Sequence, residues 1–323
     1  MKAVRVIPHP DGGRIEIQDI PVPGVTEGKV LVRVRASGVN RGEITQARDR
    51  LSGLPGTVGV EFAGEVSAVG AGVTTWREGD RVMGHGRECQ AEYVLADPLA
   101  LMPVPDKLGW IEAASFPNAF ITAHDAVVTN GELARGESIL VNAASGGVAW
   151  ASLQIASLLG ASTVIATSRS ADKLAGLSQY GVDVGIDTSR QSLLEGIMAA
   201  TDKRGVDVII DMVGAPAFEE NVKGLAVRGR LVNIARLGGE TATLDLGQLW
   251  LKRLRLIGVT FRTRSEAERL ACIQACARDM LPFLQEDKIR WAIDRTFALE
   301  DVHSAHAYLM AGKHSGKIVL TVD

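Results

Sequence analysis

Cysteine is scarce in this sequence, in which Cys89, Cys272 and Cys276 are the only three. So small and odd a number excludes a disulfide framework. Cys272 and Cys276 lie four positions apart in RLACIQACARDM, a segment with the apolar spacing of a helix, so they share one helix face. We interpret them as small buried hydrophobic residues rather than as a redox pair.

Long apolar runs are absent as well. No uninterrupted apolar segment reaches the roughly 18 residues that a membrane-spanning helix needs. The stretch MKAVRVIPHPDGG at the start of the sequence lacks the apolar core of a secretory signal. We therefore expect a cytoplasmic protein that does not bind membranes.

Neither sign of charge dominates the composition. Lys and Arg total 35 and Asp and Glu total 38, which gives a formal net charge of -3. This balance provides no broad positive field, and Lys and Arg form no clustered stripe. We therefore expect no nucleic acid partner, and the function must be inferred from local sites.

The pattern of apolar residues divides the 323-residue chain into unlike parts. A length above about 250–300 residues favours two domains. Residues 1–115 contain short β-like runs separated by Gly and Pro, whereas residues 116–264 alternate between Val/Ile-rich strands and amphipathic helices. This alternation predicts an α/β domain with a doubly wound, six-stranded parallel sheet. Residues 265–323 begin with a long helix and end in the strand GKIVLTV, which we expect to return to the first module.

The stretch VNAASGGVAWASLQ joins the first strand of this sheet to its first helix. Backbone N–H groups and the positive end of the helix dipole bind a dinucleotide pyrophosphate at such a turn. We predict that Ser145, Gly146, Gly147 and Val148 bind the cofactor there. Ala149 stands where the G-x-G-x-x-G fingerprint has its third glycine, a position that serves helix packing. The alternative interpretation is that these small residues serve close packing alone.

The end of the second strand selects between NAD and NADP. The segment TVIATSRSADK has no acidic residue at the strand end to bind a ribose, and it offers Ser168, Arg169 and Lys173. Arg169 and Lys173 lie four positions apart, so we expect them on one helical turn, where they can hold a 2′-phosphate together. The sequence thus favours NADP(H), while an ordinary solvated helix face is the alternative.

The order of these segments resembles the medium-chain dehydrogenase/reductase superfamily, and specifically its zinc-free, quinone oxidoreductase-like branch, which includes the zeta-crystallin type. ASGVNRGEI is similar to the A-x-G-V-N-x-x-D/E segment of that branch and AASGGVA to its A-A-x-G-G-V-G loop. Further similar segments are GVEFAGEVSAVGAGV, GDRV, GVDVIIDMVG, GRLVNIA and HSGKIVL. The resemblance implies a GroES-like catalytic domain formed by residues 1–115 and 265–323, a Rossmann NADP-binding domain at 116–264, and a homodimer joined through the Rossmann domains.

Metal ligands are missing where zinc-dependent relatives have them. Those relatives place a Cys after the segment corresponding to SGV and a His in a G-H-E segment, and this chain has Asn40 and Val60 there. A catalytic zinc needs about three protein ligands, and a structural zinc often has four Cys. His85 and Cys89 in GHGREC are the one tempting pair, without an evident third ligand. We therefore predict no metal site.

A tyrosine acid is missing too, because none of Tyr93, Tyr180 and Tyr308 is followed four positions later by Lys. Without zinc or such an acid, the alkoxide of a reduced simple ketone is poorly stabilised. A quinone or an α,β-unsaturated carbonyl compound delocalises the charge that hydride brings, and the cofactor supplies the difficult step. We predict a zinc-independent oxidoreductase that transfers hydride from NADPH to a small molecule of this kind.

The resemblance places two catalytic candidates beside the nicotinamide or the acceptor. The amide of Asn40 could donate to a developing oxyanion, and Thr122 in FPNAFITAHDAV matches a family segment. The alternatives are an Asn that closes a local turn and a helical Thr bonded to its own backbone. We interpret His124 as a surface or structural residue rather than as a proton donor. Asn118 is either a cleft residue or a helix cap.

The resemblance also places the strand ends after GRLVNIA and LRLIGVT around the nicotinamide and its ribose. Ligands of doubly wound sheets bind beyond the carboxyl ends of the strands, which agrees with this placement. The predicted cofactor-binding residues there are Asn233, Ala235, Phe261 and Arg262. Lys317 in HSGKIVL is a weaker candidate for the cofactor or the cleft, and an ordinary solvated lysine is the default interpretation.

Two other functions fit the same residues. An enoyl-thioester reductase of the same superfamily would use the same cofactor and would need a channel for its long substrate. A non-catalytic NADPH-binding protein is the second alternative, since zinc-free relatives serve as lens crystallins or bind AU-rich RNA or membranes. The balanced charge argues against nucleic acid.

Overall fold

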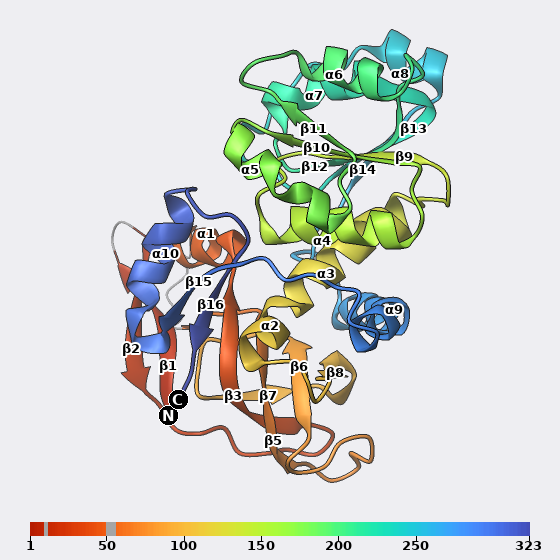
Figure 1. Ribbon diagram of the computed structural model, residues 1–323. Helices are drawn as coiled ribbons and strands as arrows, with labels where there is room; N and C mark the ends of the chain where they lie inside the picture. Colours follow the sequence, from red (N-terminus) through yellow and green to blue (C-terminus); the bar gives the residue numbers. More distant parts are fainter. Residues whose placement is uncertain (10–11, 50–55) are drawn as a thin grey trace. The chain divides into compact units, whose positions relative to one another are not determined.

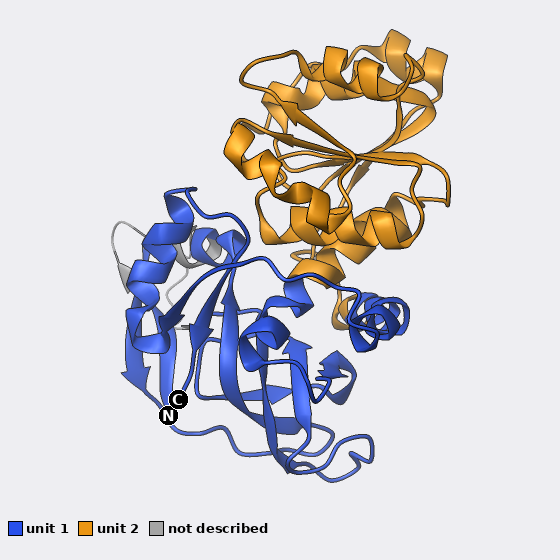
Figure 2. Ribbon diagram, in the orientation of Figure 1, with its two compact units in different colours: residues 1–118, 270–323 blue, residues 119–269 orange. Residues whose placement is uncertain are grey.

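The computed structural model describes residues 1–9, 12–49 and 56–323. It separates into two compact units, of which unit 1 comprises residues 1–118 and 270–323 and unit 2 comprises residues 119–269. Figure 2 shows that both ends of the chain build unit 1, while the segment between them forms unit 2.

Unit 1 is organised around the long strand β3 (Val30–Val39), whose side chains are mostly buried. β3 pairs antiparallel with β5 (Glu61–Val69), β7 (Tyr93–Ala96) and β16 (Lys317–Thr321). The β16 pairing places Ile318 opposite Val39. The prediction that the closing strand returns to the first module is therefore confirmed, and β16 lies beside β3 in Figure 1.

Three of the remaining strands of unit 1 extend the same sheet, and the other three form a separate antiparallel sheet. The strands are β1 (Lys2–His9), β2 (Gly12–Asp19), β4 (Gly56–Thr57), β6 (Arg81–His85), β8 (Leu101–Pro103) and β15 (Ile293–Ala298). The helices are α1 (Arg41–Asp49), α2 (Trp110–Ser115) and α10 (Val302–Met310), with 3-10 turns η1 (Pro98–Ala100) and η4 (Leu299–Asp301).

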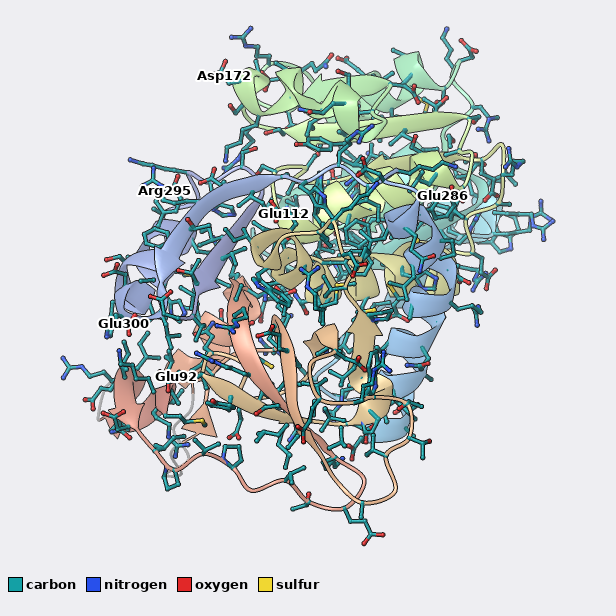
Figure 3. All side chains as sticks on the ribbon, turned by 60° about the horizontal axis from the view of Figure 1, so that its bottom comes forward. Glu92, Glu112, Asp172, Glu286, Arg295 and Glu300 are labelled. Atoms are coloured by element: carbon teal, nitrogen blue, oxygen red, sulfur yellow. The ribbon has the colours of Figure 1, made fainter. Side chains whose placement is uncertain are left out.

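Both chain ends are tied into unit 1. The Lys2 ammonium forms an ion pair with Glu300, and the backbone N–H of Lys2 donates to a Glu92 carboxylate oxygen at 2.8 Å. Glu92 and Glu300 are labelled in Figure 3. The N-terminal ammonium donates to the Ile20 carbonyl at 2.7 Å. These contacts join β1 to segments about 90 and 300 positions away in sequence.

Unit 2 contains a doubly wound sheet in which all strands are parallel. Its strand order is β11-β10-β9-β12-β13-β14, so the predicted six-stranded parallel sheet is confirmed. The central strands are almost fully buried, as expected of strands covered on both faces. Figure 1 shows α6 and α7 on one face of this sheet and α4 on the other.

The strands of unit 2 are β9 (Ser138–Val141), β10 (Thr163–Ser168), β11 (Val184–Asp187), β12 (Val206–Asp211), β13 (Leu225–Asn233) and β14 (Arg255–Gly258). The helices are α3 (Pro117–His124), whose first two residues belong to unit 1, α4 (Gly147–Leu158), α5 (Ala171–Ala175), α6 (Leu193–Ala200), α7 (Ala215–Gly224) and α8 (Leu246–Lys252). A π-helical segment, η2 (Asp125–Asn130), continues α3, and η3 (Leu177–Tyr180) is a 3-10 turn.

The long helix α9 (Glu266–Gln285) leads from unit 2 into unit 1. Cys276 is buried on it, Cys272 is half-buried, and neither forms a disulfide. This arrangement agrees with our interpretation of Cys272 and Cys276 as small packing residues on one helix face. Among the described residues, no helix has the length and apolar character required to cross a bilayer.

Candidate functional site

The predicted cofactor-binding residues of unit 2 gather at one edge of the parallel sheet. Ser145–Val148 follow β9, Ser168 ends β10, Asn233 ends β13, and Phe261 and Arg262 come after β14. The carboxyl ends of parallel strands lie at the same edge, which is where doubly wound sheets bind their ligands. The structure therefore brings together residues that are more than 110 positions apart in sequence.

The turn between β9 and α4 has open space at Gly146. Gly146 is the N-cap of α4 with a φ of -90°, and no side chain caps this helix end. A Cβ built on Gly146 would meet nothing within 4 Å, so neither backbone strain nor packing in the protein requires glycine there. The first N–H groups of a helix lack intrahelical partners and attract anions. Ala149 is fully buried, in agreement with a packing role.

The basic residues after β10 are arranged differently from the prediction. Ser170 is the N-cap of α5 and has extended backbone angles, so the helix begins at Ala171. Arg169 is therefore exposed before the helix while Lys173 lies within it, and the expectation that both share a helical turn is wrong. The Ser170 N–H donates to Ser168 Oγ at 3.2 Å, which forms a local turn that delays the helix.

A buried polar network fixes the strand ends of unit 2. Asp211, at the end of β12 and fully buried, accepts from the Val213 N–H at 2.9 Å and from Asn233 Nδ2 at 3.0 Å. Asn142 donates to Asn221 Oδ1 at 3.0 Å and accepts from the Thr167 hydroxyl at 2.9 Å. The Asn233 side chain therefore holds the strand ends together, and its neighbour Ala235 adds a carbonyl that accepts from Asn233 Nδ2 at 2.9 Å.

Thr122 and His124 lie on α3. Thr122 is half-buried, and its hydroxyl has no hydrogen-bond partner within the part of the chain that the structure describes, so the structure gives no support to a helical Thr bonded to its own backbone. His124 is 1% exposed, which rules out a surface position. Phe261 is half-buried beneath the Arg264 guanidinium, 5.0 Å from the ring centre, while Arg262 is exposed.

A second polar site lies inside unit 1, where Asn40 follows β3. Lys317, the first residue of β16, is only 4% exposed, so an ordinary solvated lysine is the wrong interpretation. Its ammonium forms an ion pair with the fully buried Glu61 and donates to Asn40 Oδ1 at 2.9 Å. The Asn40 side-chain amide in turn donates to Glu61 Oε1 and to Glu43 Oε1, each at 2.8 Å.

A glycine makes this arrangement possible. A Cβ built on Gly38, in the SGV segment before Asn40, would lie 2.1 Å from Glu61 Oε1 and 2.9 Å from the Ala114 carbonyl oxygen. Only a residue without a side chain lets the Glu61 carboxylate lie across β3 and reach Lys317.

This cluster contains two carboxyl groups, of Glu43 and Glu61, and one ammonium group, of Lys317. Glu43 is 5% exposed on α1, and burial raises the pKa of its carboxyl to about 8. Repulsion by Glu61 adds to that rise in pKa, while the Asn40 hydrogen bond and Lys317 oppose it. Glu43 therefore carries a proton at neutral pH, which leaves one negative and one positive charge in the cluster.

Gln90 suits both protonation states of Glu43. Its Nε2 donates to Glu43 Oε2 at 2.9 Å, while its Oε1 is buried without a hydrogen-bond partner among the described residues. A half-turn of the amide would present Oε1 to the Glu43 proton at the same distance, because the two ends of a glutamine amide have nearly the same shape.

No metal-binding group is formed by the described residues, since they contain no cluster of three or more His, Cys, Asp and Glu. The Cys89 thiol is buried, and burial together with the Glu43 and Glu61 carboxylates raises its pKa. Metals bind the thiolate, so this environment opposes a ligand role for Cys89. His85 and Cys89 thus gain no third ligand in the described chain.

Sequence patterns alone did not single out Glu43, Glu61, Gln90 or Asp211. One signal was present: Glu61 interrupts the apolar run GVEFAG, and Asp211 ends the apolar run VDVIID. A carboxylate at such a place is either exposed or paired inside the protein, and here both are fully buried.

Comparisons with known proteins agree with both units. The "Alcohol dehydrogenase GroES-like domain" family matches residues 26–129, and the "Zinc-binding dehydrogenase" family matches residues 147–275. Quinone oxidoreductase-like protein 2 of Bos taurus is 31% identical over 95% of this chain and 88% of its own length. Quinone oxidoreductase of Pseudomonas aeruginosa is 33% identical over 92% of both chains. A mycobacterial protein, solved in complex with NADPH, is 28% identical with a TM-score of 0.87 over 99% of this chain and all of its own.

The protonation of Glu43 predicts how stability changes with pH. Because the pKa is raised from 4.5 to about 8 on folding, the folded protein binds more protons than the unfolded chain between these values, and stability falls as pH rises. The free energy of unfolding of the wild type should therefore decrease relative to that of Glu43→Gln by up to about 1.4 kcal/mol per pH unit.

Urea unfolding at pH 5.5, 6.5 and 7.5 measures this difference. Glu65→Gln, on the same strand β5 but 39% exposed in its ion pair with Arg35, is the control for the substitution. A Glu43→Gln difference that does not change across this pH range would show that Glu43 is ionised throughout.

Proposed function

The chain belongs to the quinone oxidoreductase-like branch of the medium-chain dehydrogenase/reductase superfamily, and from this membership we propose a zinc-independent reductase of quinones or α,β-unsaturated carbonyl compounds that uses NADPH. The observation that supports this proposal is the buried Lys317 ammonium, which lies together with Glu61 in the polar site at Asn40. Asn40 stands where zinc-dependent relatives have a Cys ligand. A cation is thus already built into this cluster, and the residues that the structure describes form no group of three or more His, Cys, Asp and Glu that could hold a metal.

The cofactor is NADP(H), and the residues of unit 2 fit it. The open turn at Ser145–Val148 suits the pyrophosphate, and Ser168, Arg169 and Lys173 suit the 2′-phosphate. The strand ends at Asn233, Ala235, Phe261 and Arg262 suit the nicotinamide side. The structural relative that was solved with NADPH supports this choice. When bound, NADPH supplies the hydride.

The polar cluster of unit 1 favours an acceptor that spreads its own charge. Glu61 neutralises Lys317 and Glu43 is protonated, so no net positive charge remains there for a localised alkoxide. The Thr122 hydroxyl, which has no partner among the described residues, is a neutral group that can donate to a ligand. Neutral donors suffice for a hydroquinone anion or an enolate, and water supplies the proton.

We further propose a homodimer formed through unit 2. β14 is an edge strand of the sheet, and α8, which precedes β14 in the chain, exposes Leu246, Trp250 and Leu251 by 66–78%. Leu256 on β14 is 36% exposed. An edge strand has unpaired backbone groups that can join a second copy antiparallel about a twofold axis, and the apolar side chains would be buried with it.

The acceptor class is tested by following NADPH absorbance with a quinone such as naphthoquinone, a cyclic enone, crotonyl thioester and a simple ketone. We expect the quinone or the enone to be reduced at least about tenfold faster than the ketone, because only they delocalise the charge. A metal chelator should leave the rate unchanged. Fastest turnover of the thioester would favour an enoyl reductase, and no NADPH oxidation with any acceptor would favour a non-catalytic protein.

The cofactor preference is tested at the basic residues after β10. Arg169→Ala and Lys173→Ala should each lower kcat/KM for NADPH by about tenfold and leave that for NADH within twofold, because a charge-assisted hydrogen bond contributes about 1.5–3 kcal/mol. Arg278→Ala on α9, where Arg278 bonds its neighbour Asp279, is the control. Equal or better turnover of wild type with NADH contradicts the preference.

The dimer is tested by light scattering at micromolar concentration. The wild type should have about twice the chain mass of 34.3 kDa, and Trp250→Glu combined with Leu246→Glu should shift it to the mass of one chain. Leu99→Glu, a 51% exposed leucine of unit 1, serves as the control and should remain dimeric. A wild type with the mass of one chain would exclude this dimer.

A further inference from the structure

The orientation of the Asn40 amide is set by charge. An ammonium group can only donate hydrogen bonds, so the Asn40 atom 2.9 Å from Lys317 Nζ must be the oxygen. The nitrogen then faces Glu43 and Glu61, whose carboxyl oxygens at 2.8 Å accept its two hydrogens. The ambiguity between oxygen and nitrogen that often affects asparagine is absent at this site.

The Asn40 side chain is thereby saturated. An asparagine side chain has two N–H donors and an oxygen with two lone pairs. Both donors are bonded to carboxyl groups, and the oxygen accepts from Lys317 at 2.9 Å and from Asn118 Nδ2 at 2.8 Å. Asn40 thus has no N–H left for a bound acceptor while this cluster is intact.

Asn118 is the outer member of the same chain of hydrogen bonds. Its backbone N–H donates to Glu61 Oε2 at 2.8 Å, and its side chain must turn Nδ2 toward the Asn40 oxygen. The second Nδ2 hydrogen and Oδ1 have no partner among the residues that the structure describes, and the side chain is half-buried. Of Asn40 and Asn118, only Asn118 therefore has an unused donor, and it is half-buried, whereas the amide of Gln90 is fully buried beside Glu43.

We propose that Asn118, and not Asn40, donates the hydrogen bond that stabilises the oxyanion of the reduced acceptor. This inference rests on the proposed function. The hydride adds to the acceptor with its electron pair, the charge moves to the acceptor oxygen, and the proton that completes the reduction comes from water. Asn118 remains chemically unchanged, while Asn40 is a positioning residue that keeps the second N–H of Asn118 available.

The test compares kcat and NADPH affinity in Asn118→Ala, Asn40→Ala and the double variant. Removal of an oxyanion donor lowers kcat by about 10²–10³-fold in well-formed sites. For a half-buried amide we expect a loss of about 10–100-fold in each single variant, with the Kd for NADPH within twofold of wild type. Because Asn40 acts through Asn118, the double variant should be no slower than the slower single variant.

Asn130→Ala is the matched control, because Asn130 is also half-buried and donates to the Asp125 carbonyl of its own π-helical segment at 2.8 Å. Its kcat should stay within twofold of wild type. If Asn118→Ala does not fold, Asn118→Leu keeps the side-chain shape without its polar atoms and should show the same loss.

Three results would overturn the inference: unchanged kcat in the Asn118 variants, losses that multiply in the double variant, or a raised Kd for NADPH with unchanged kcat. The last result would assign the Asn118 amide to the cofactor. A wrong proposed function gives a different result, because the wild type would then oxidise NADPH with none of the acceptors. That result would also exclude the proposed role of Asn118.

Discussion

The ion pair between Lys317 and Glu61 is the contact on which the polar site of unit 1 depends. It joins residues 256 positions apart, from strands that both pair with β3. Both side chains are buried, and removal of one partner from a buried pair costs about 3–5 kcal/mol because the other charge is left without compensation. Gly38 makes room for the Glu61 carboxylate, and the Lys317 ammonium then fixes the direction of the Asn40 amide.

The polar side chains at the sites of the two units are positioned by different interactions. In unit 2 the topology does most of the positioning, because parallel strands end at a common edge and the helix after β9 presents its N–H groups there. Asp211 and Asn142 then lock neighbouring strand ends to one another. In unit 1 no topological rule supplies a site, and buried charge determines which polar groups face each other.

Apolar periodicity was enough to predict the parallel sheet of unit 2 and the return of GKIVLTV to the first module, because core strands are continuous apolar runs. It was not enough for Lys317, for which a solvated lysine was the default interpretation. Its exposure of only 4% follows from the pairing of β16 with β3 beside Glu61, which is a long-range contact. The prediction that Arg169 and Lys173 share a helical turn was wrong for a local reason, since the turn at Ser168 and Ser170 delays the start of α5. Asn40 was identified as important, but its hydrogen-bond partners could not be counted without knowing the fold.

Charge neutrality in the cluster links the fold to the class of acceptor that we propose. One ammonium, one carboxylate and one protonated carboxyl give a group of side chains that is polar but carries no net charge. Such a group orients amides well, because each donor has a fixed acceptor in a low-dielectric interior. It stabilises a localised alkoxide poorly, because it offers neither a metal ion nor an acid in position to protonate the oxygen. The reaction that we propose suits neutral donors, since a quinone or an enone distributes the negative charge over its own conjugated atoms.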